Sequence, residues 1–114
     1  MILDGIVKIL YRMLGELMSY EEKIEYKFKE RRHIIELKEY IDSTYDEHYA
    51  SDKYQATDVI IDSGHGEGFC MGNIMKYAKR YGNKEGKNRK DLLKILHYAI
   101  IMLDVHDAHK DTDD

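Results

Sequence analysis

The sequence contains no proline and no tryptophan, and it has a single cysteine, Cys70, in 114 residues. Because proline is the strongest helix breaker, its absence favours long, uninterrupted helices. One thiol cannot form an internal disulfide framework or a cysteine-based zinc finger. Apolar residues make up 43% of the chain, which argues against wholesale disorder. The length indicates one domain, or one domain with a helical extension.

Long apolar runs without charge are also absent. Residues 1–18 are rich in apolar side chains, but Asp4, Lys8, Arg12 and Glu16 interrupt them every four residues. A membrane-spanning helix needs about 20 predominantly apolar residues. The same segment lacks the basic start and the small-residue cleavage site of a signal peptide. We therefore expect no membrane partner and a cytoplasmic location.

The formal net charge of −4 conceals an uneven distribution of charge along the chain. Residues 1–68 carry 9 basic and 15 acidic side chains, residues 69–94 carry 8 and 2, and residues 95–114 carry 1 and 5. A basic segment thus lies between two acidic ones. A local positive charge of this kind is compatible with an anionic partner even though the whole chain is acidic.

The apolar residues of the first 45 positions have helical spacing. Residues near the start alternate by three and four, as in a heptad seam: Leu3, Ile6, Leu10, Met13 and Leu17. This pattern predicts a helical extension over residues 1–45 that mediates homo-oligomerisation. Ser19 and Glu22 fit a capping box, so a second helix can begin there and form a hairpin with the first. The alternative is one long helix.

Residues 46–109 are predicted to form a compact helical domain, followed by an acidic tail at 110–114. Thr57 or Asp58 is expected to cap a short helix, and a glycine-rich stretch over residues 63–68 then leads into a long helix over 69–81. Gly82 has the position of a C′ residue in a left-handed conformation. A basic loop over 82–88 precedes a last helix over 90–108. No strand pattern competes, so the predicted fold class is all-α.

The basic segment is the strongest indication of function. Lys76 and Arg80 share an exposed helix face, and Lys84 and Lys87 follow in the loop, so that together they can surround a phosphate. Tyr77 and Tyr98 offer flat rings suited to stacking on a base. The alternative is a solvated face of lysines balanced by acidic neighbours. The glycines do not form a Walker loop, because the Gly-Lys-Ser/Thr ending is missing.

Two further clusters could bind metal ions. Glu21-Glu22-x-x-Glu25 and Glu39-x-x-Asp42 fit the magnesium-binding pattern of MazG-like nucleotide pyrophosphohydrolases. No breaker separates the two halves, and on one continuous helix Glu25 and Glu39 would be about 21 Å apart. His106-Asp107 is the dipeptide of HD-type phosphohydrolases. Solvated helix charges are the preferred interpretation of both clusters, and no metal ligand is assigned.

The second half of the chain resembles the SaV-like family of small bacteriophage proteins. That family has an approximate pattern Phe-x-x-Gly-Asn-x-x-Lys-Tyr-x-x-Arg, then a lysine-containing loop, Asp-Leu-x-Lys, and a later tyrosine. The resemblance covers about residues 48–105. The matching positions are His48, Tyr49, Asp58, Val59, Ile60, Phe69, Gly72, Asn73, Lys76, Tyr77, Arg80, Lys84, Asp91, Leu92, Lys94 and Tyr98.

One branch of the SaV-like family is described as phage nucleotide kinase. The resemblance therefore implies nucleoside monophosphate kinase-like phosphoryl transfer without a Walker loop, with ATP as phosphoryl donor and the host cytoplasm as location. Asn73 is expected to contact base, sugar or the helix interface, and His48 and Asp91 are the candidate catalytic residues. Sequence-specific DNA binding is not expected. Two alternatives stay open: a non-catalytic protein that sequesters a host signalling nucleotide, and a magnesium-dependent pyrophosphohydrolase.

Overall fold

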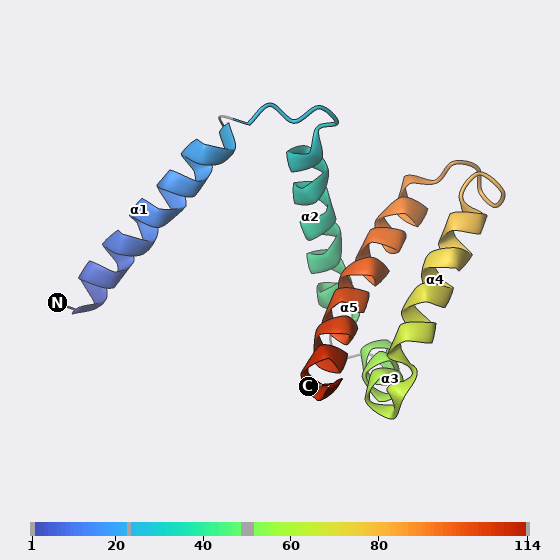
Figure 1. Ribbon diagram of the computed structural model, residues 1–114. Helices are drawn as coiled ribbons and strands as arrows, with labels where there is room; N and C mark the ends of the chain where they lie inside the picture. Colours follow the sequence, from blue (N-terminus) through green and yellow to red (C-terminus); the bar gives the residue numbers. More distant parts are fainter. Residues whose placement is uncertain (1, 23, 49–51, 114) are drawn as a thin grey trace. The chain divides into compact units, whose positions relative to one another are not determined.

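The computed structural model describes the backbone of residues 2–22, 24–48 and 52–113, and it describes side chains within 4–15, 24–46 and 56–109. The described part of the chain is helical and contains no strand, which confirms the all-α prediction. The elements are α1 (Ile2–Glu22), α2 (Glu30–His48), α3 (Asp52–Ile60), a π-helical turn η1 (Ile61–His65), α4 (Gly66–Arg80) and α5 (Arg89–Asp113), as shown in Figure 1.

The chain divides into two compact units, Met1–His33 and Ile34–Asp114. The sequence pattern instead places the start of the compact domain near residue 46. The difference has a physical basis, because most of α2 belongs with the second unit. Tyr40 of α2 has its ring edge against His97 of α5, with 6.0 Å between the ring centroids.

In the first unit, α1 continues through Ser19, so the helix start predicted at that residue is wrong. Ser19 is followed by residues that propagate a helix, and a capping box does not by itself interrupt one. Apolar side chains along the described part of α1, among them Ile6, Leu10 and Met13, are about half exposed. In the part of the chain that the structure describes, no helix is both long and apolar enough to cross a bilayer.

The helix break lies instead between α1 and α2, at a place where the sequence shows no proline or glycine. Lys29 has a positive φ of 58°, which ends any continuous helix at that point. The Glu30 side chain accepts a hydrogen bond from the Phe28 backbone amide at 2.6 Å, and the Lys29 carbonyl accepts one from the His33 amide at 3.1 Å. The alternative of one continuous helix through residues 26–38 is therefore excluded.

In the second unit, α4 and α5 form an antiparallel pair (Figure 1). Gly66 is buried where they pack, and an added Cβ there would lie 3.0 Å from Val105 and 3.3 Å from Ile61. A side chain at this position would require those neighbours to move by a few tenths of an ångström, so glycine suits the close packing. Cys70, Tyr77 and Val105 are the buried apolar residues of the described part of the chain.

The glycines of the second unit have different roles. Gly64, in η1, has a φ of 92° and bends the chain between α3 and α4. Gly82 has a φ of 84° directly after the Tyr81 C-cap, as predicted from its position.

The prediction that Thr57 or Asp58 starts a helix is wrong, because α3 begins at Asp52. The last helix is also longer than predicted and continues to Asp113 through most of the acidic tail.

We predict that Cys70 is chemically inert in the folded protein. Its side chain is fully buried, and burial raises the pKa of the thiol, which disfavours the reactive thiolate. In denaturant, Ellman's reagent should label about one thiol per chain. In the native protein it should label Cys70 only at the rate at which unfolding exposes the thiol. A Lys79→Cys variant, with its second thiol on an exposed position, should react at once. Rapid labelling of the native wild-type protein would contradict the burial.

Candidate functional site

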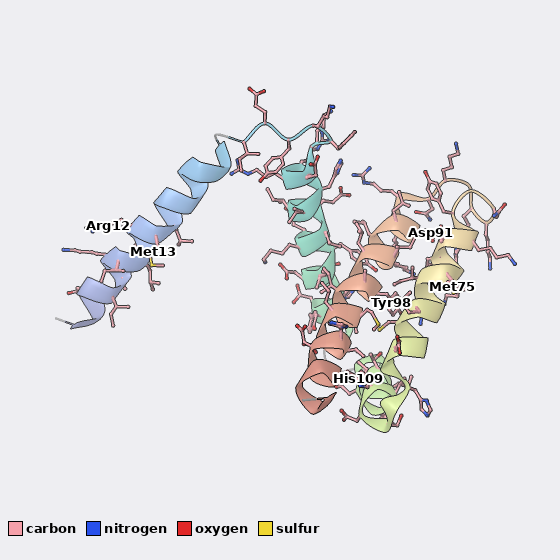
Figure 2. The ribbon with its side chains drawn as sticks, in the orientation of Figure 1. Arg12, Met13, Met75, Asp91, Tyr98 and His109 are labelled. Carbon is pink, nitrogen blue, oxygen red and sulfur yellow. The ribbon has the colours of Figure 1, made fainter. Side chains whose placement is uncertain are left out.

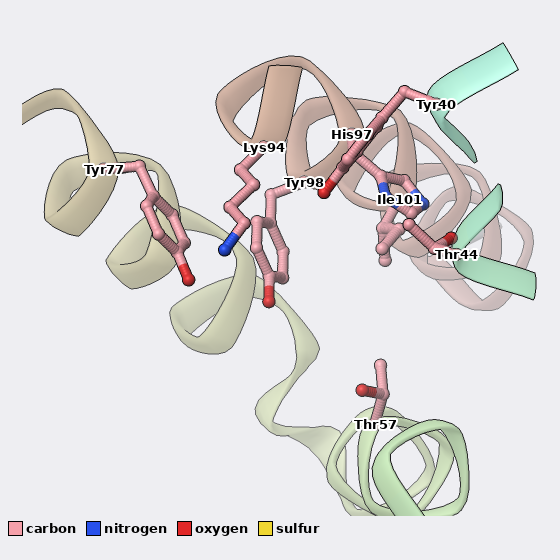
Figure 3. A pocket seen from close by; sticks show the side chains of 8 residues that line it. All are labelled: Tyr40, Thr44, Thr57, Tyr77, Lys94, His97, Tyr98 and Ile101. Carbon is pink, nitrogen blue, oxygen red and sulfur yellow. The ribbon is translucent and has the colours of Figure 1, made fainter. Parts of the chain in front are cut away.

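Four helices of the second unit contribute side chains to one pocket (Figure 3). Its volume of about 40 Å³ holds about three water molecules, or one group of a few atoms such as a phosphate. The lining is rich in hydroxyl and amino groups, with one aliphatic side chain. The lining residues are Tyr40 and Thr44 of α2, Thr57 of α3, Tyr77 of α4, and Lys94, His97, Tyr98 and Ile101 of α5.

Two lysine side chains converge on the ring of Tyr77. The Nζ atom of Lys76 lies 4.5 Å from the ring centroid, and the Nζ atom of Lys94 lies 4.8 Å from it. Lys94 is one helical turn before Tyr98 on α5, so the antiparallel packing of α4 on α5 brings it to Tyr77. A cation within about 6 Å of an aromatic centroid is attracted by the electron density of the ring face. Tyr77 thus positions two positive charges at the edge of the pocket.

The aromatic residues of the pocket contact each other. Tyr77 stacks on Tyr98 with 6.1 Å between centroids and an angle of 14°, and Figure 3 shows their hydroxyl groups pointing to the same side. Phe69 meets Tyr98 edge-on at 5.8 Å. Because the two tyrosine rings face one another, they form the wall of the pocket. In this arrangement one face of each ring is turned towards the other tyrosine.

The ionisation of Tyr77 is shifted by these neighbours. Burial of the phenol acts to raise its pKa, but hydrogen bonds and positive charge from Lys76 and Lys94 together outweigh burial. The pKa of Tyr77 therefore lies below the ordinary value of 10.0. The hydroxyl is therefore a stronger acid, and a better hydrogen-bond donor to an anion, than a phenol with the ordinary pKa.

The structure brings together some of the residues that the sequence predicts for the site, and separates others from it. Tyr77 and Tyr98 meet at the pocket, and Lys76 contacts the ring of Tyr77 without lining the pocket. Asn73 donates its side-chain amide to the Phe69 carbonyl of its own helix at 2.9 Å, which is a structural contact. The His48 side chain lies outside the described residues.

Arg80 does not lie on an exposed face, in contrast to the expectation from spacing. Its side chain is 31% exposed and its Nε is 3.6 Å from Asp91 Oδ1, while its second contact, to Glu85, is 3.5 Å long. Asp91 is buried at the start of α5 beside the α4–α5 loop (Figure 2). Among the described residues no hydrogen-bond donor reaches its Oδ2 atom. The pair therefore connects the two helices mainly by charge.

The α4–α5 loop has a defined hydrogen-bond pattern. The Gly82 amide donates to the Gly86 carbonyl at 2.9 Å, and the Asn88 side chain caps α5 by accepting from the Lys90 amide at 2.9 Å. The side chain of Asn88 therefore caps the start of this helix. Lys84 and Lys87 are exposed on the loop and do not line the pocket.

Sequence reasoning did not single out several lining residues. Tyr40, Thr44, Thr57 and His97 have no motif spacing that relates them, because they come from three different helices. The one available signal was Lys94 with Tyr98, whose separation of four residues places both on one helix face. The tertiary arrangement was needed to add the rest.

The described members of the carboxylate and histidine clusters do not form a metal site. Within the described residues, no group of three or more His, Cys, Asp or Glu side chains is arranged to hold a metal ion. Asp42 binds Lys38 one turn earlier on α2 at 2.8 Å. The side chains of Glu21 and Glu22 lie outside the described residues, and Glu25 lies in the segment before α2. His106 and Asp107 are exposed on α5.

We predict that Asp91→Asn lowers the free energy of unfolding by about 1–3 kcal/mol, because it leaves the half-buried Arg80 without its opposite charge. Full burial of both partners would cost more, but solvent screens the one-third of Arg80 that is exposed. Urea denaturation measures the change. Glu85→Gln is the matched control and should change stability by less than about 0.5 kcal/mol, since Glu85 is exposed. Equal effects of the two substitutions would contradict the role given to Asp91.

We also predict that Tyr77 ionises below the ordinary tyrosine pKa of 10.0. In a pH titration followed by NMR of labelled tyrosine rings, the signal that Tyr77→Phe removes should have its midpoint below that value. Lys94→Met should move that transition to higher pH, since a stabilising positive charge is lost. Between the folded pKa and the unfolded value near 10, the unfolded chain binds more protons, so this group makes stability rise with pH. A Tyr77 transition unaffected by Lys94→Met would contradict the assigned cause.

Comparison with known families gives one match. The family model of proteins of unknown function DUF3310 matches residues 43–100, just over half of the chain. The matched range contains Thr44, Thr57, Tyr77, Lys94 and Tyr98, and hence most of the pocket. No curated protein and no solved structure matches the chain significantly. The chain therefore belongs to the DUF3310 family.

Proposed function

We propose that this protein binds a nucleotide and holds a phosphate group of it in the pocket beside Tyr77. The observation that carries the proposal is the convergence of Lys76 and Lys94 on the buried ring of Tyr77, beside a small pocket that Tyr77 and Lys94 line. Two ammonium groups near the same ring repel each other, and a bound dianion relieves that repulsion. The hydroxyl groups of Tyr77 and Tyr98 point to one side and can donate to phosphate oxygens.

The site proposed from the structure differs in part from the one proposed from the sequence. Lys76 and Tyr77 belong to both proposed sites. Tyr98 is now proposed to donate a hydrogen bond through its hydroxyl group instead of stacking on a base. Lys94 takes the phosphate role that spacing assigned to Arg80, because Arg80 is engaged with Asp91. Lys84 and Lys87 are assigned to further phosphates outside the pocket. The volume of the pocket limits it to a single phosphate-sized group, so base and sugar lie outside it.

The finer proposal is nucleoside monophosphate kinase-like phosphoryl transfer, which rests on the likeness to SaV-like phage proteins. Such a reaction depends chiefly on positioning and on stabilising negative charge, both of which fixed lysines provide. ATP is the proposed donor. Asp91 is given no role in orienting the acceptor, because its carboxylate faces Arg80. His48 stays the candidate acid.

The proposed homo-oligomer is supported by α1. Its described apolar side chains are exposed at helical spacing, and a seam of this kind is normally covered by another helix. The helix that covers the α1 seam is proposed to come from a second copy of the chain.

We expect Lys94→Met to weaken the binding of a nucleoside monophosphate at least tenfold, because one of the two cations is lost. Isothermal titration calorimetry with each common monophosphate measures this. Lys79→Met removes the same charge from an exposed position of α4 that does not line the pocket, and it should leave affinity within about twofold. Equal loss in both variants would indicate general charge attraction and contradict the pocket.

Recovery of the nucleotide separates turnover from sequestration. The protein is incubated with a monophosphate, ATP and Mg²⁺, then denatured, and the nucleotides are separated by chromatography. A new diphosphate that disappears in Lys94→Met supports phosphoryl transfer. Unchanged nucleotide released in stoichiometric amount supports sequestration and contradicts the kinase proposal. Failure of every nucleotide to bind would overturn both.

A further inference from the structure

The side of α5 that faces away from α4 carries a row of exposed leucines. Leu92, Leu96 and Leu103 are 41%, 44% and 64% exposed. With Ala99 between the last two, their spacing of four, three and four residues is that of a coiled-coil seam. Met75 is comparably exposed on the outer side of α4 (Figure 2), but it does not belong to such a row.

The composition of α5 indicates that this side is normally covered. Residues 92–103 are apolar apart from Lys94 and His97, counting Tyr98 as apolar. One side of the helix packs on α4 through Tyr98 and Val105, and a second side lines the pocket with Ile101. A helix that is apolar all round is characteristic of one surrounded by neighbours. Among the described residues of the second unit, the leucine row has no covering helix.

We propose that the leucine row is the contact between two copies of this chain, with the two α5 helices packed antiparallel about a two-fold axis. Leu92 of one copy then lies opposite Leu103 of the partner subunit, and Leu96 lies opposite Ala99 of the partner subunit. The axis passes between residues 97 and 98, midway along the row. This arrangement is isologous, so each contact occurs twice.

Charge complementarity selects the antiparallel direction. Arg89 and Asp107 are 18 residues apart, which is five turns at about 3.6 residues per turn, so they lie on the same flank of the helix. In an antiparallel pair the same flanks meet, and Arg89 faces Asp107 of the partner subunit at both ends. A parallel pair would bring both Arg89 side chains to one end and both Asp107 side chains to the other, so that neither meets its opposite charge. The opposed helix dipoles also favour the antiparallel pair.

Glu36 of α2 fixes the position of Arg89. Its carboxylate accepts from Arg89 Nε at 2.7 Å and from Nη2 at 2.5 Å. A guanidinium group has five N–H donors and can bind two carboxylates. Arg89 can therefore bridge Glu36 and Asp107 of the partner subunit. This interface is separate from the α1 seam and does not depend on the proposed nucleotide site.

The test is the mass of the full chain by size-exclusion chromatography with light scattering, over a range of concentrations. Wild type should associate. Leu96→Lys places a charge near the two-fold axis, and it should raise the concentration for half-association at least tenfold. Asp107→Arg is an exposed substitution that should not impair folding. It should raise the concentration for half-association several-fold, because the new arginine repels Arg89 of the partner subunit. Met75→Lys adds the same charge to α4 and should leave association unchanged.

Three results would overturn the proposal. A monomeric wild type would show that no second copy covers the leucine row. If Leu96→Lys were then also monomeric but melted at a much lower temperature than wild type, another segment of the same chain would be the one that covers the row. Association unchanged by both α5 variants but lost in Leu10→Lys would place the contact on α1. Weakening by Met75→Lys equal to that by Leu96→Lys would show that the effect is unspecific. Nucleotide binding is not measured in any arm, so the proposed function is tested separately.

Discussion

The packing of α4 against α5 is the interaction on which the second unit depends, and two points along it determine its geometry. At one end, Gly66 lets Val105 approach closely, so the helix axes come near each other there. Towards the other end, Tyr77 stacks on Tyr98 and Arg80 faces the buried Asp91. These contacts set the register of the antiparallel pair. Because the register is set, Lys94 reaches Tyr77, and the pocket is bounded by rings and amino groups whose positions follow from helix packing.

With α4 packed against α5, the basic side chains of the chain have different partners. The basic segment from 69 to 94 does not act as one surface, because its members are used differently. Lys76 and Lys94 converge on Tyr77, Arg80 is paired with Asp91, Arg89 is bound to Glu36, and Lys84 and Lys87 remain on the loop. A local excess of positive charge is therefore divided among a candidate ligand site, two structural ion pairs and an exposed turn. The proposed function depends on the first of these, with Lys84 and Lys87 of the exposed turn assigned to further phosphates.

Part of this site could be predicted from the sequence, and part could not. The basic segment and its tyrosines pointed to Lys76, Tyr77 and Tyr98, and the family pattern included Lys94. The same spacing made Arg80 look exposed, since periodicity on one helix does not reveal a buried carboxylate on the next. Tyr40, Thr44 and Thr57 were missed because their proximity arises from the way α2 and α3 pack near α5, over long sequence separations. The break at Lys29 was missed because a non-glycine residue adopts a positive φ there.

The amino-acid sequence by itself determined that the chain is helical, that Gly82 ends a helix and that the positive charge is concentrated between residues 69 and 94. These properties follow from local backbone preferences and from periodicity, which short segments carry on their own. Only the tertiary structure decided which cation meets which partner. Ion pairing and pocket formation depend on the register between helices, and that register is set by contacts such as Gly66 with Val105 that no local pattern encodes.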